Sequence, residues 1–355
     1  MEQKSLNQNK WIENVGDASP TSESSTCDSE TIIYLFYPLD PNLSPTLNRR
    51  IQSMPFSRNS LLILFAFFLP SLSQAAEPIQ PLGKVETVKT GFAFTEGPSW
   101  SVSGNLYFSD IPNATIHVVK PNGTVGVFTD DSKHTNGTLV DSKNRLLACQ
   151  MDGQVVAYNT ANEKITILAD SYDGKRFNAP NDLVIDADGG IYFTDPLFRA
   201  PNPLPQGIQA VYYISTSGKV TRVTDHIAAP NGIALSPDGK RLYVAPSHQA
   251  EMLVFDVLSA GKLGEERTFC TLTQPEGKNG TGGDGMVLDV EGNLYFTTHL
   301  GVEIFSPNGE KLGLVQFPEQ PANVTFAGED RKTMYVTART GLYRVEMPIS
   351  GLKPN

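Results

Sequence analysis

Oxygen-bearing side chains recur at comparable points along this chain, at or just before the start of short apolar segments. They are Glu96, Asn136, Asn181 with Asp182, Asn231, Asp284 and Asn323. Carboxylates that a fold brings together repel one another unless a cation lies among them. An all-oxygen ligand set, without Cys or His, suits a hard cation, so we expect Ca²⁺ first and Mg²⁺ or Mn²⁺ after it. The alternative is that Asn and Asp occupy these positions only because they shape turns, although Glu96 forms turns poorly.

The segments that these residues introduce are copies of one unit, a strand, a turn and a second strand. The clearest copy spans residues 179–196, where two glycines after Asp188 suit a tight hairpin between β-branched and aromatic runs. The turn residues of the six copies are 40, 45, 50, 53 and 39 residues apart, at Gly104, Asn144, Gly189, Gly239, Gly292 and Arg331. Repeats of this length with two to four strands each are typical of a β-propeller.

Each copy except the last is followed by two further strand-like segments. The sixth is followed by one, residues 341–347, and a strand-like segment without a partner precedes the first copy at residues 84–90. Pairing these two segments removes two exposed sheet edges. Residues 76–355 are therefore predicted to form an all-β, six-bladed β-propeller whose last blade is closed by the N-terminal strand. The loops after each second strand then share the face of the strand entrances, and they carry Asp110, Gln150, Asp195, His248, His299 and Arg339.

The first 75 residues differ in composition from the rest. Residues 1–53 are rich in Ser, Asn and Pro without sustained periodicity, which predicts a disordered or non-native extension. Residues 54–75 carry Arg58, an apolar run over Leu61–Leu69, and small residues at Ser73 and Ala75, the pattern of a signal peptide cleaved after Ala75. We therefore expect Met54 to be the true start and the protein to be periplasmic or secreted, without a stable membrane anchor. A membrane anchor or a buried helix is the alternative for this run.

Residues 76–355 carry 23 basic and 31 acidic side chains, a net charge of −8. No basic stripe is present, which argues against nucleic acid or anionic lipid as a partner. Cys149 and Cys270 each lie inside an apolar strand-like segment. They are expected to be buried thiols rather than a disulfide on which the fold depends.

Four motifs give the chain a specific likeness over about Gly91–Val345. They are EGPSW at residues 96–100, the unit at residues 179–196, APNGIALSPDGKRLYV at residues 229–244 and GDGMVLDVEGNLYFT at residues 283–297. In these the sequence resembles the SMP-30/gluconolactonase/LRE-like family of six-bladed, calcium-dependent lactonases. The resemblance implies one divalent cation in the central tunnel, held by Glu96, Asn181, Asn231 and Asp284. It departs from the family pattern at Gly283, where Pro is common.

With this ligand set, Glu96 and Asp284 balance the charge of a dication, and the two Asn carbonyls complete a partial shell with room for water and substrate. The expected reaction is metal-dependent hydrolysis of a sugar lactone, in which the cation polarises the carbonyl and Asp284, the expected catalytic residue, assists attack by water. Expected substrate contacts are Asn136, Asp182, Asp195, His299 and Arg176. Four of these residues have an alternative role without substrate contact. Asp182 would support the metal ligands from behind, Asp195 would cap a turn, and His299 and Arg176 would lie on the surface.

Two other functions fit the same residues. An arylesterase or phosphotriesterase needs a similar metal centre with a more apolar rim, and the polar residues of the rim favour the sugar lactone weakly. A propeller that binds a ligand without catalysis has no need for two carboxylates at its axis.

The Pro-rich loop over residues 197–209 is expected to shape access to the site. The sequence predicts neither the native lactone nor the oligomeric state.

Overall fold

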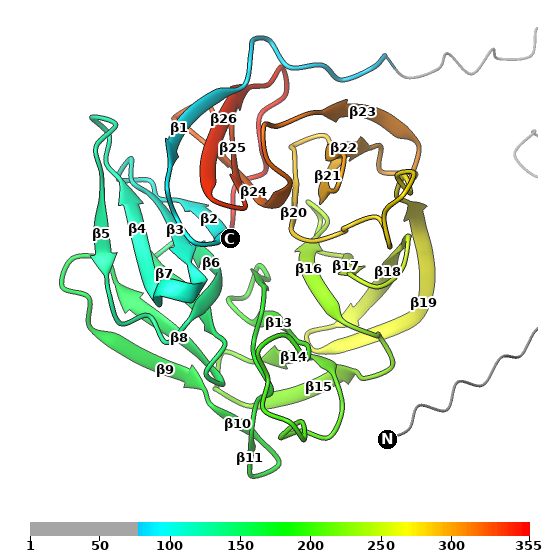
Figure 1. Ribbon diagram of the computed structural model, residues 1–355. Coiled ribbons are helices and arrows are strands. Elements are labelled where there is room, and N and C mark those ends of the chain that lie inside the picture. Colours follow the sequence, from blue (N-terminus) through cyan, green and yellow to red (C-terminus); the bar gives the residue numbers. More distant parts are fainter. Residues whose placement is uncertain (1–76) are drawn as a thin grey trace, which may run out of the picture. The chain divides into compact units, whose positions relative to one another are not determined.

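We describe residues 77–355 in a computed structural model of the chain. The predicted extension (residues 1–53) lies outside the described residues, as does the signal peptide (residues 54–75). The described residues form six four-stranded antiparallel sheets set around a common axis, as predicted (Figure 1). The only helical element of this part is a 3₁₀ turn, η2 (Ile111–Asn113). No helix there is long and apolar enough to cross a membrane.

Each blade runs outward from an inner strand near the axis. The strands are β2 (Thr95–Trp100), β3 (Leu106–Asp110), β4 (Thr115–Val119) and β5 (Val125–Thr129) in blade 1, and β6 (Thr135–Val140), β7 (Arg145–Gln150), β8 (Gln154–Asn159) and β9 (Ile165–Ala169) in blade 2. Blade 3 holds β12 (Leu183–Ile185), β13 (Ile191–Asp195), β14 (Ala210–Ile214) and β15 (Val220–Thr224), after a small hairpin of β10 (Ser171–Tyr172) and β11 (Lys175–Arg176). Blade 4 holds β16 (Pro230–Leu235), β17 (Arg241–Pro246), β18 (Glu251–Ser259) and β19 (Lys262–Thr271). Blade 5 holds β20 (Met286–Leu288), β21 (Leu294–Thr298), β22 (Gly301–Phe305) and β23 (Lys311–Val315).

Blade 6 is built from both ends of the described chain. It consists of β24 (Pro321–Ala327), β25 (Thr333–Ala338), β26 (Gly341–Glu346) and, on the outside, β1 (Glu86–Thr90). The antiparallel pairing sets Glu86 opposite Arg344, and the two side chains form an ion pair at 2.7 Å. The N-terminal strand thus supplies the missing fourth strand, which confirms the predicted closure.

The turn inside each repeat follows from its sequence. In blade 3 the Asp186 carboxylate accepts the backbone N–H groups of Asp188 and Gly190 at 3.0 and 2.7 Å. Gly189, between them, has φ +91°, a conformation that side chains disfavour. This turn sets the register in which Leu183 pairs with Phe193 and Ile185 with Ile191.

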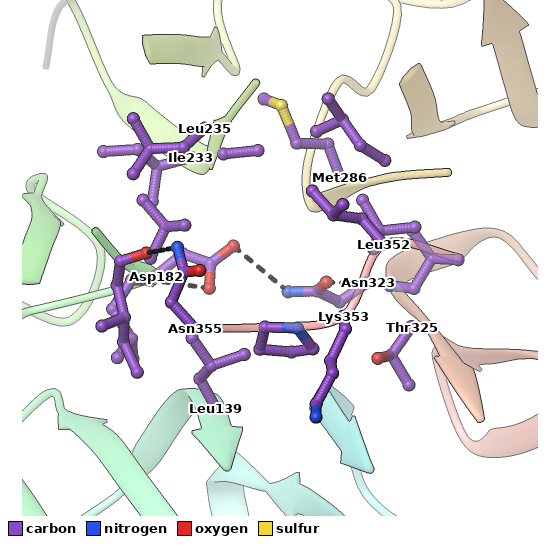
Figure 2. Close-up of a pocket in the computed structure, with 18 of the residues that line it drawn as sticks. Leu139, Asp182, Ile233, Leu235, Met286, Asn323, Thr325, Leu352, Lys353 and Asn355 are labelled. Atoms are coloured by element: carbon purple, nitrogen blue, oxygen red, sulfur yellow. Dashed lines mark hydrogen bonds between the residues drawn. The ribbon is translucent and has the colours of Figure 1, made fainter. Parts of the chain in front are cut away.

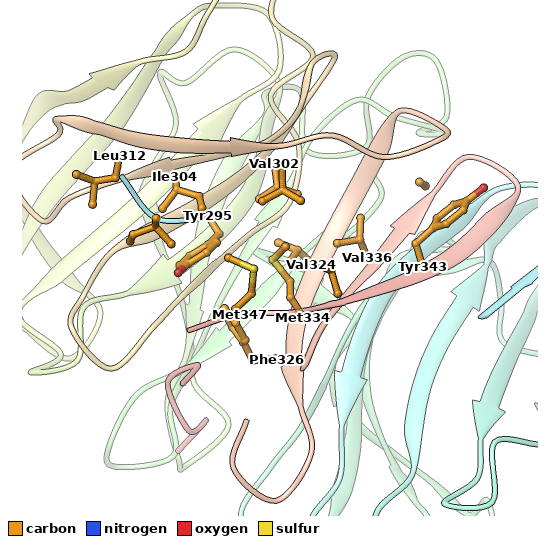
Figure 3. Packing of buried hydrophobic residues seen from close by; sticks show 14 residues of the cluster. Tyr295, Val302, Ile304, Leu312, Val324, Phe326, Met334, Val336, Tyr343 and Met347 are labelled. Atoms are coloured by element: carbon orange, nitrogen blue, oxygen red, sulfur yellow. The ribbon is translucent and has the colours of Figure 1, made fainter. Parts of the chain in front are cut away.

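The Tyr-Phe pair in the second strand of a repeat joins neighbouring blades. Successive residues of a strand point to opposite faces, so Tyr192 packs with residues of blade 4 and Phe193 with residues of blade 2. In blade 5, Tyr295 meets Phe326 of blade 6 at a ring distance of 5.1 Å (Figure 3). Each fully buried side chain of this kind stabilises the fold by about 1.5–3 kcal/mol. Cys149 and Cys270 are buried among such residues as free thiols, as expected.

Candidate functional site

The starts of the inner strands converge at one end of the central channel. There they line a cavity of about 480 Å³, together with residues of the surrounding loops. The lining includes five of the residues singled out from the sequence, namely Glu96, Asn136, Asn181, Asn231 and Asp284. Four of them, Glu96, Asn136, Asn181 and Asn231, are buried with no more than 7% of their surface exposed, and Asp284 is partly buried. The fold therefore gathers these side chains, from five different blades, at the floor of one pocket.

Hydroxyl groups of the second strands fix the entrance of the following blade. Each hydroxyl belongs to the Ser or Thr of the repeated YF(S/T) sequence, and it donates to a backbone carbonyl at the entrance of the next blade. The bonds run from Ser109 Oγ to Asn136 O, from Thr194 Oγ1 to Asn231 O and from Thr297 Oγ1 to Ala322 O, each at 2.8 Å. The position of a site residue is thus set by the blade before it as well as by its own.

Glycines beside the site residues let neighbouring entrances approach closely. The Gly137 N–H donates to Asn181 O at 2.7 Å, and a Cβ at Gly137 would overlap the backbone and carboxylate of Asp182. A Cβ at Gly285 would overlap the side chain of Asn323. The D-G and N-G pairs of the sequence therefore combine one polar ligand candidate with one residue small enough to seat the next blade.

Three carboxyl groups, two on the cavity floor and Asp182 below it, influence one another, and the pKa of each is raised. Burial, the charge of Asp284 and then that of Asp182 raise the pKa of Glu96 well above its ordinary value, against the N–H of Gly97, which donates at 3.0 Å. The pKa of Asp284 is raised by burial, while the amide of Asn231 and the guanidinium of Arg339 lower it. Burial also raises the pKa of Asp182, to about 7. Negative charge is therefore costly here unless a cation offsets it.

The donor set fits a hard divalent cation. The Asn181 residue is 3% exposed and lines the cavity, so the oxygen of its side-chain amide can serve a ligand there. The Asn231 amide nitrogen donates to Ser247 Oγ at 2.9 Å, which leaves its carbonyl oxygen for the cavity. Within residues 77–355 no three His, Cys, Asp or Glu side chains group as a metal site. A site here would use two carboxylates, Glu96 and Asp284, with Asn oxygens.

Asp182 and Asn323 lie deeper than the cavity floor. They line a second, smaller space of about 130 Å³ in the channel, where Asn323 Nδ2 lies 3.5 Å from Asp182 Oδ2 (Figure 2). Asp182 Oδ1 accepts the N–H of Leu183 at 2.9 Å. Asp182 does not line the upper cavity, and this placement favours support behind the ligands over direct substrate contact.

Asp195 holds the loop that leads to Asn181. Its two carboxylate oxygens accept the backbone N–H groups of Asn178 and Ala179, both at 2.8 Å. Asp110, at the same position of blade 1, accepts those of Ala93 and Phe94. Burial raises the pKa of Asp195 to about 7, although these N–H donors lower it. The shared geometry favours a bracing role for Asp195.

Arg176 and His299 are not among the residues that line the cavity. The Arg176 guanidinium donates to the backbone carbonyls of Phe177 and Asn178, at 2.9 and 3.1 Å, so it is engaged in the wall of the fold. His299 packs against Gly282, which does line the cavity. Neither side chain is brought together with Glu96 and Asp284.

The wall of the cavity is more apolar than the polar rim expected from the sequence. It includes Phe94, Ile111, Pro112, Met151 and Phe198 beside the polar residues Ser247, Gln320, Arg199 and Arg339. Phe198 and Arg199 belong to the Pro-rich loop, which therefore does line the opening. The Arg339 guanidinium lies 5.3 Å from the ring centre of Phe94 and donates to Gln320 Oε1 at 2.6 Å. The sequence carries no signal, beyond a position in or next to loops, that these side chains would form the cavity wall.

The fold and the site define a class, a six-bladed propeller with an oxygen-lined pocket on its axis. Residues 94–340 match the SMP-30/Gluconolactonase/LRE-like region. The chain belongs to this family, as its motifs had indicated.

Individual relatives span most of the chain. A gluconolactonase of Zymomonas mobilis subsp. mobilis is 31% identical over 310 residues, covering 80% of this chain and 86% of the relative. The structure of a gluconolactonase of Xanthomonas campestris is 29% identical with a TM-score of 0.68, covering 77% and 95%. A calcium-binding protein, regucalcin of Agrobacterium tumefaciens, is 20% identical with a TM-score of 0.66, covering 78% and 97%, and its likeness shows the fold.

Proposed function

We propose that this protein is a lactonase that hydrolyses a sugar lactone with a bound divalent cation, Ca²⁺ first among the candidates. The observation that carries the proposal is the meeting of Glu96, Asp284, Asn181 and Asn231 at the floor of one cavity. The gluconolactonases of Zymomonas mobilis and Xanthomonas campestris support the class of activity. The substrate is then a small molecule, consistent with an acidic chain that lacks a basic stripe.

Glu96, Asn181, Asn231 and Asp284 would hold the cation, which supplies positive charge to the carbonyl oxygen of the lactone as that oxygen gains negative charge. The carboxylate of Asp284 would accept a hydrogen bond from the attacking water and orient it toward the carbonyl carbon. Asn136, on the same floor, would bind a hydroxyl group of the substrate. The Arg339 guanidinium, which already lowers the pKa of Asp284, would lie beside the product carboxylate.

The apolar wall favours a second candidate on the same centre. Phe94, Ile111, Met151 and Phe198 suit an aryl ester or an aryl-substituted lactone better than a polyhydroxylated ring. An arylesterase or phosphotriesterase activity is therefore kept beside the sugar lactonase.

A panel of substrates separates these candidates. We expect pH-stat assays to show turnover of glucono-1,5-lactone that a chelator abolishes and added Ca²⁺ restores. Asp284→Ala and Glu96→Ala should lose both turnover and metal binding. Turnover of aryl esters or phosphotriesters alone would support the second candidate, full activity after chelation would refute the metal, and silence on every substrate would favour a binding protein.

We also propose that the protein is exported, to the periplasm or the medium. The support is the sequence pattern of residues 54–75, and the described residues do not bear on it. N-terminal sequencing of the native protein tests this, with Ala76 as the expected first residue. A start upstream of Leu61 would refute it.

A further inference from the structure

The last residues of the chain enter the central channel from the side opposite the cavity. After β26, residues 351–355 turn inward, and the C-terminus lies at the middle of the ring (Figure 1). Leu352, Lys353, Pro354 and Asn355 line the lower space of about 130 Å³ together with Asp182 and Asn323 (Figure 2). The tail thus borders the same space as Asp182 and Asn323, the two polar residues that lie deeper than the cavity floor.

Two inner strands differ from the other four in length. β12 and β20 have three residues each, whereas β2, β6 and β16 have six and β24 has seven. These two short strands follow Asn181 and Asp284, two of the four residues proposed to hold the cation. The ladder continues from each short strand to the site residue, because the Asn181 N–H donates to Thr194 O at 2.9 Å and the Asp284 N–H to Thr297 O at 3.2 Å. A shift of either strand against its neighbour would therefore move the site residue with it.

The tail binds the ends of both short strands. The Leu352 N–H donates to Leu288 O, the last residue of β20, at 2.8 Å. The Asn355 amide donates to Ile185 O, the last residue of β12, at 3.2 Å. A third bond anchors the tail itself, because the Gly351 N–H donates to Arg331 O of blade 6 at 2.8 Å.

Side-chain packing adds to these hydrogen bonds. Leu352 packs against the apolar cluster that contains Met286 and Leu288 of β20. Gly351 lies so close to Phe326 of β24 that a Cβ would overlap the ring. The tail therefore touches blades 3, 5 and 6 at once, at the ends of the inner strands that lie away from the site residues.

We propose that the C-terminal tail, residues 351–355, is a positioning element of the site: it clamps the short strands β12 and β20 and so holds Asn181 and Asp284 in place. The part of this proposal that concerns cation binding rests on the proposed function. The mechanical part, the clamping of two strands, holds for the metal-free protein as well.

The first test compares a variant that ends after Gly351 with the full chain, using amide hydrogen exchange without metal. Each lost hydrogen bond changes a local opening equilibrium about fivefold, and the lost Leu352 packing adds to this, so exchange in β12 and β20 should quicken about tenfold. Exchange in the long strands β6 and β16 should stay within about twofold. Unchanged exchange in β12 and β20, or an equal increase throughout the propeller, would overturn the proposal.

The second test measures Ca²⁺ affinity by titration calorimetry. The truncated protein should bind Ca²⁺ about tenfold more weakly, with Asn355→Ala intermediate. The exposed Lys120 of blade 1, which lines neither space, is the control: Lys120→Ala should leave the affinity within about twofold. Equal affinity in the truncated and full-length proteins would overturn the positioning role. If the full-length protein binds no Ca²⁺, the proposed metal fails while the exchange experiment still decides the clamp.

Discussion

The carboxyl layer on the axis predicts that stability depends on pH and on calcium together. The perturbation is the double variant Glu96→Gln, Asp284→Asn, which keeps the shape of both side chains and removes their charge. In the metal-free wild type, burial and repulsion from neighbouring carboxylates raise the pKa of both groups, and burial raises that of Asp182. The folded protein then holds protons that the unfolded chain has released.

The sign and size of the effect follow from that proton difference. This contribution to stability is fully present below the ordinary carboxyl range near pH 4, and it is lost as the pH rises toward about 7, the pKa of Asp182, and about 8, that of Asp284. One retained proton lowers the free energy of unfolding by about 1.4 kcal/mol per pH unit. In a domain of this size that is roughly 3–6 °C in Tm. Calcium at about 100 times its Kd raises the free energy of unfolding by about 2.7 kcal/mol.

Both effects, the loss of stability with pH and the stabilisation by calcium, can be measured by thermal unfolding. It is followed by circular dichroism between pH 5 and 7.5, with calcium or with chelator. We expect the Tm of the chelated wild type to fall with pH and calcium to raise it by roughly 5–10 °C at neutral pH. The double variant should show a smaller fall, due to Asp182, and no response to calcium. A flat pH profile of the chelated wild type, or an equal calcium response in the variant, would refute the reasoning.

Two further predictions concern the residues that hold the layer. Gly285→Ala places a methyl group against Asn323 and should lower the free energy of unfolding by about 1–3 kcal/mol in urea, whereas Gly126→Ala, with open space around it, should change it little; equal effects would contradict the close approach. Asp195→Ala leaves two buried N–H groups without acceptors and should cost about 2–4 kcal/mol, unlike Asp188→Ala on the surface. An increase in KM with unchanged stability would instead assign Asp195 to the substrate.

The sequence predicts the propeller well because its repeat is local. Each unit carries its own turn residues and its own alternation of apolar side chains, and the number of strand-like segments after the sixth copy identifies the closing strand. The convergence of the strand entrances follows from that topology alone. Five side chains that were singled out as entrance residues do line one cavity.

The sequence predicts side-chain engagement less well, because this depends on neighbours far along the chain. Arg176 looks like a free cation in a loop, yet backbone carbonyls of its own loop occupy it. Phe94 and Met151 look like ordinary core residues, and only the three-dimensional fold shows that they form the cavity wall. The last five residues carry no motif at all, and their place in the channel depends on where β26 ends.

The second strand of a repeat performs three tasks with four consecutive residues. In YFTD of blade 3, the two aromatic rings pack against opposite neighbours, Thr194 fixes the entrance of the next blade, and Asp195 braces the entrance of its own. Blade 5 reads YFTT, so Thr298 stands where the bracing carboxylate would be. The loop before Asp284 therefore lacks the support that Asn181 receives, and β20 is also short. The tail donates a hydrogen bond to Leu288 of blade 5, the blade that lacks the bracing carboxylate. We therefore expect truncation of the tail to displace Asp284 more than Asn181.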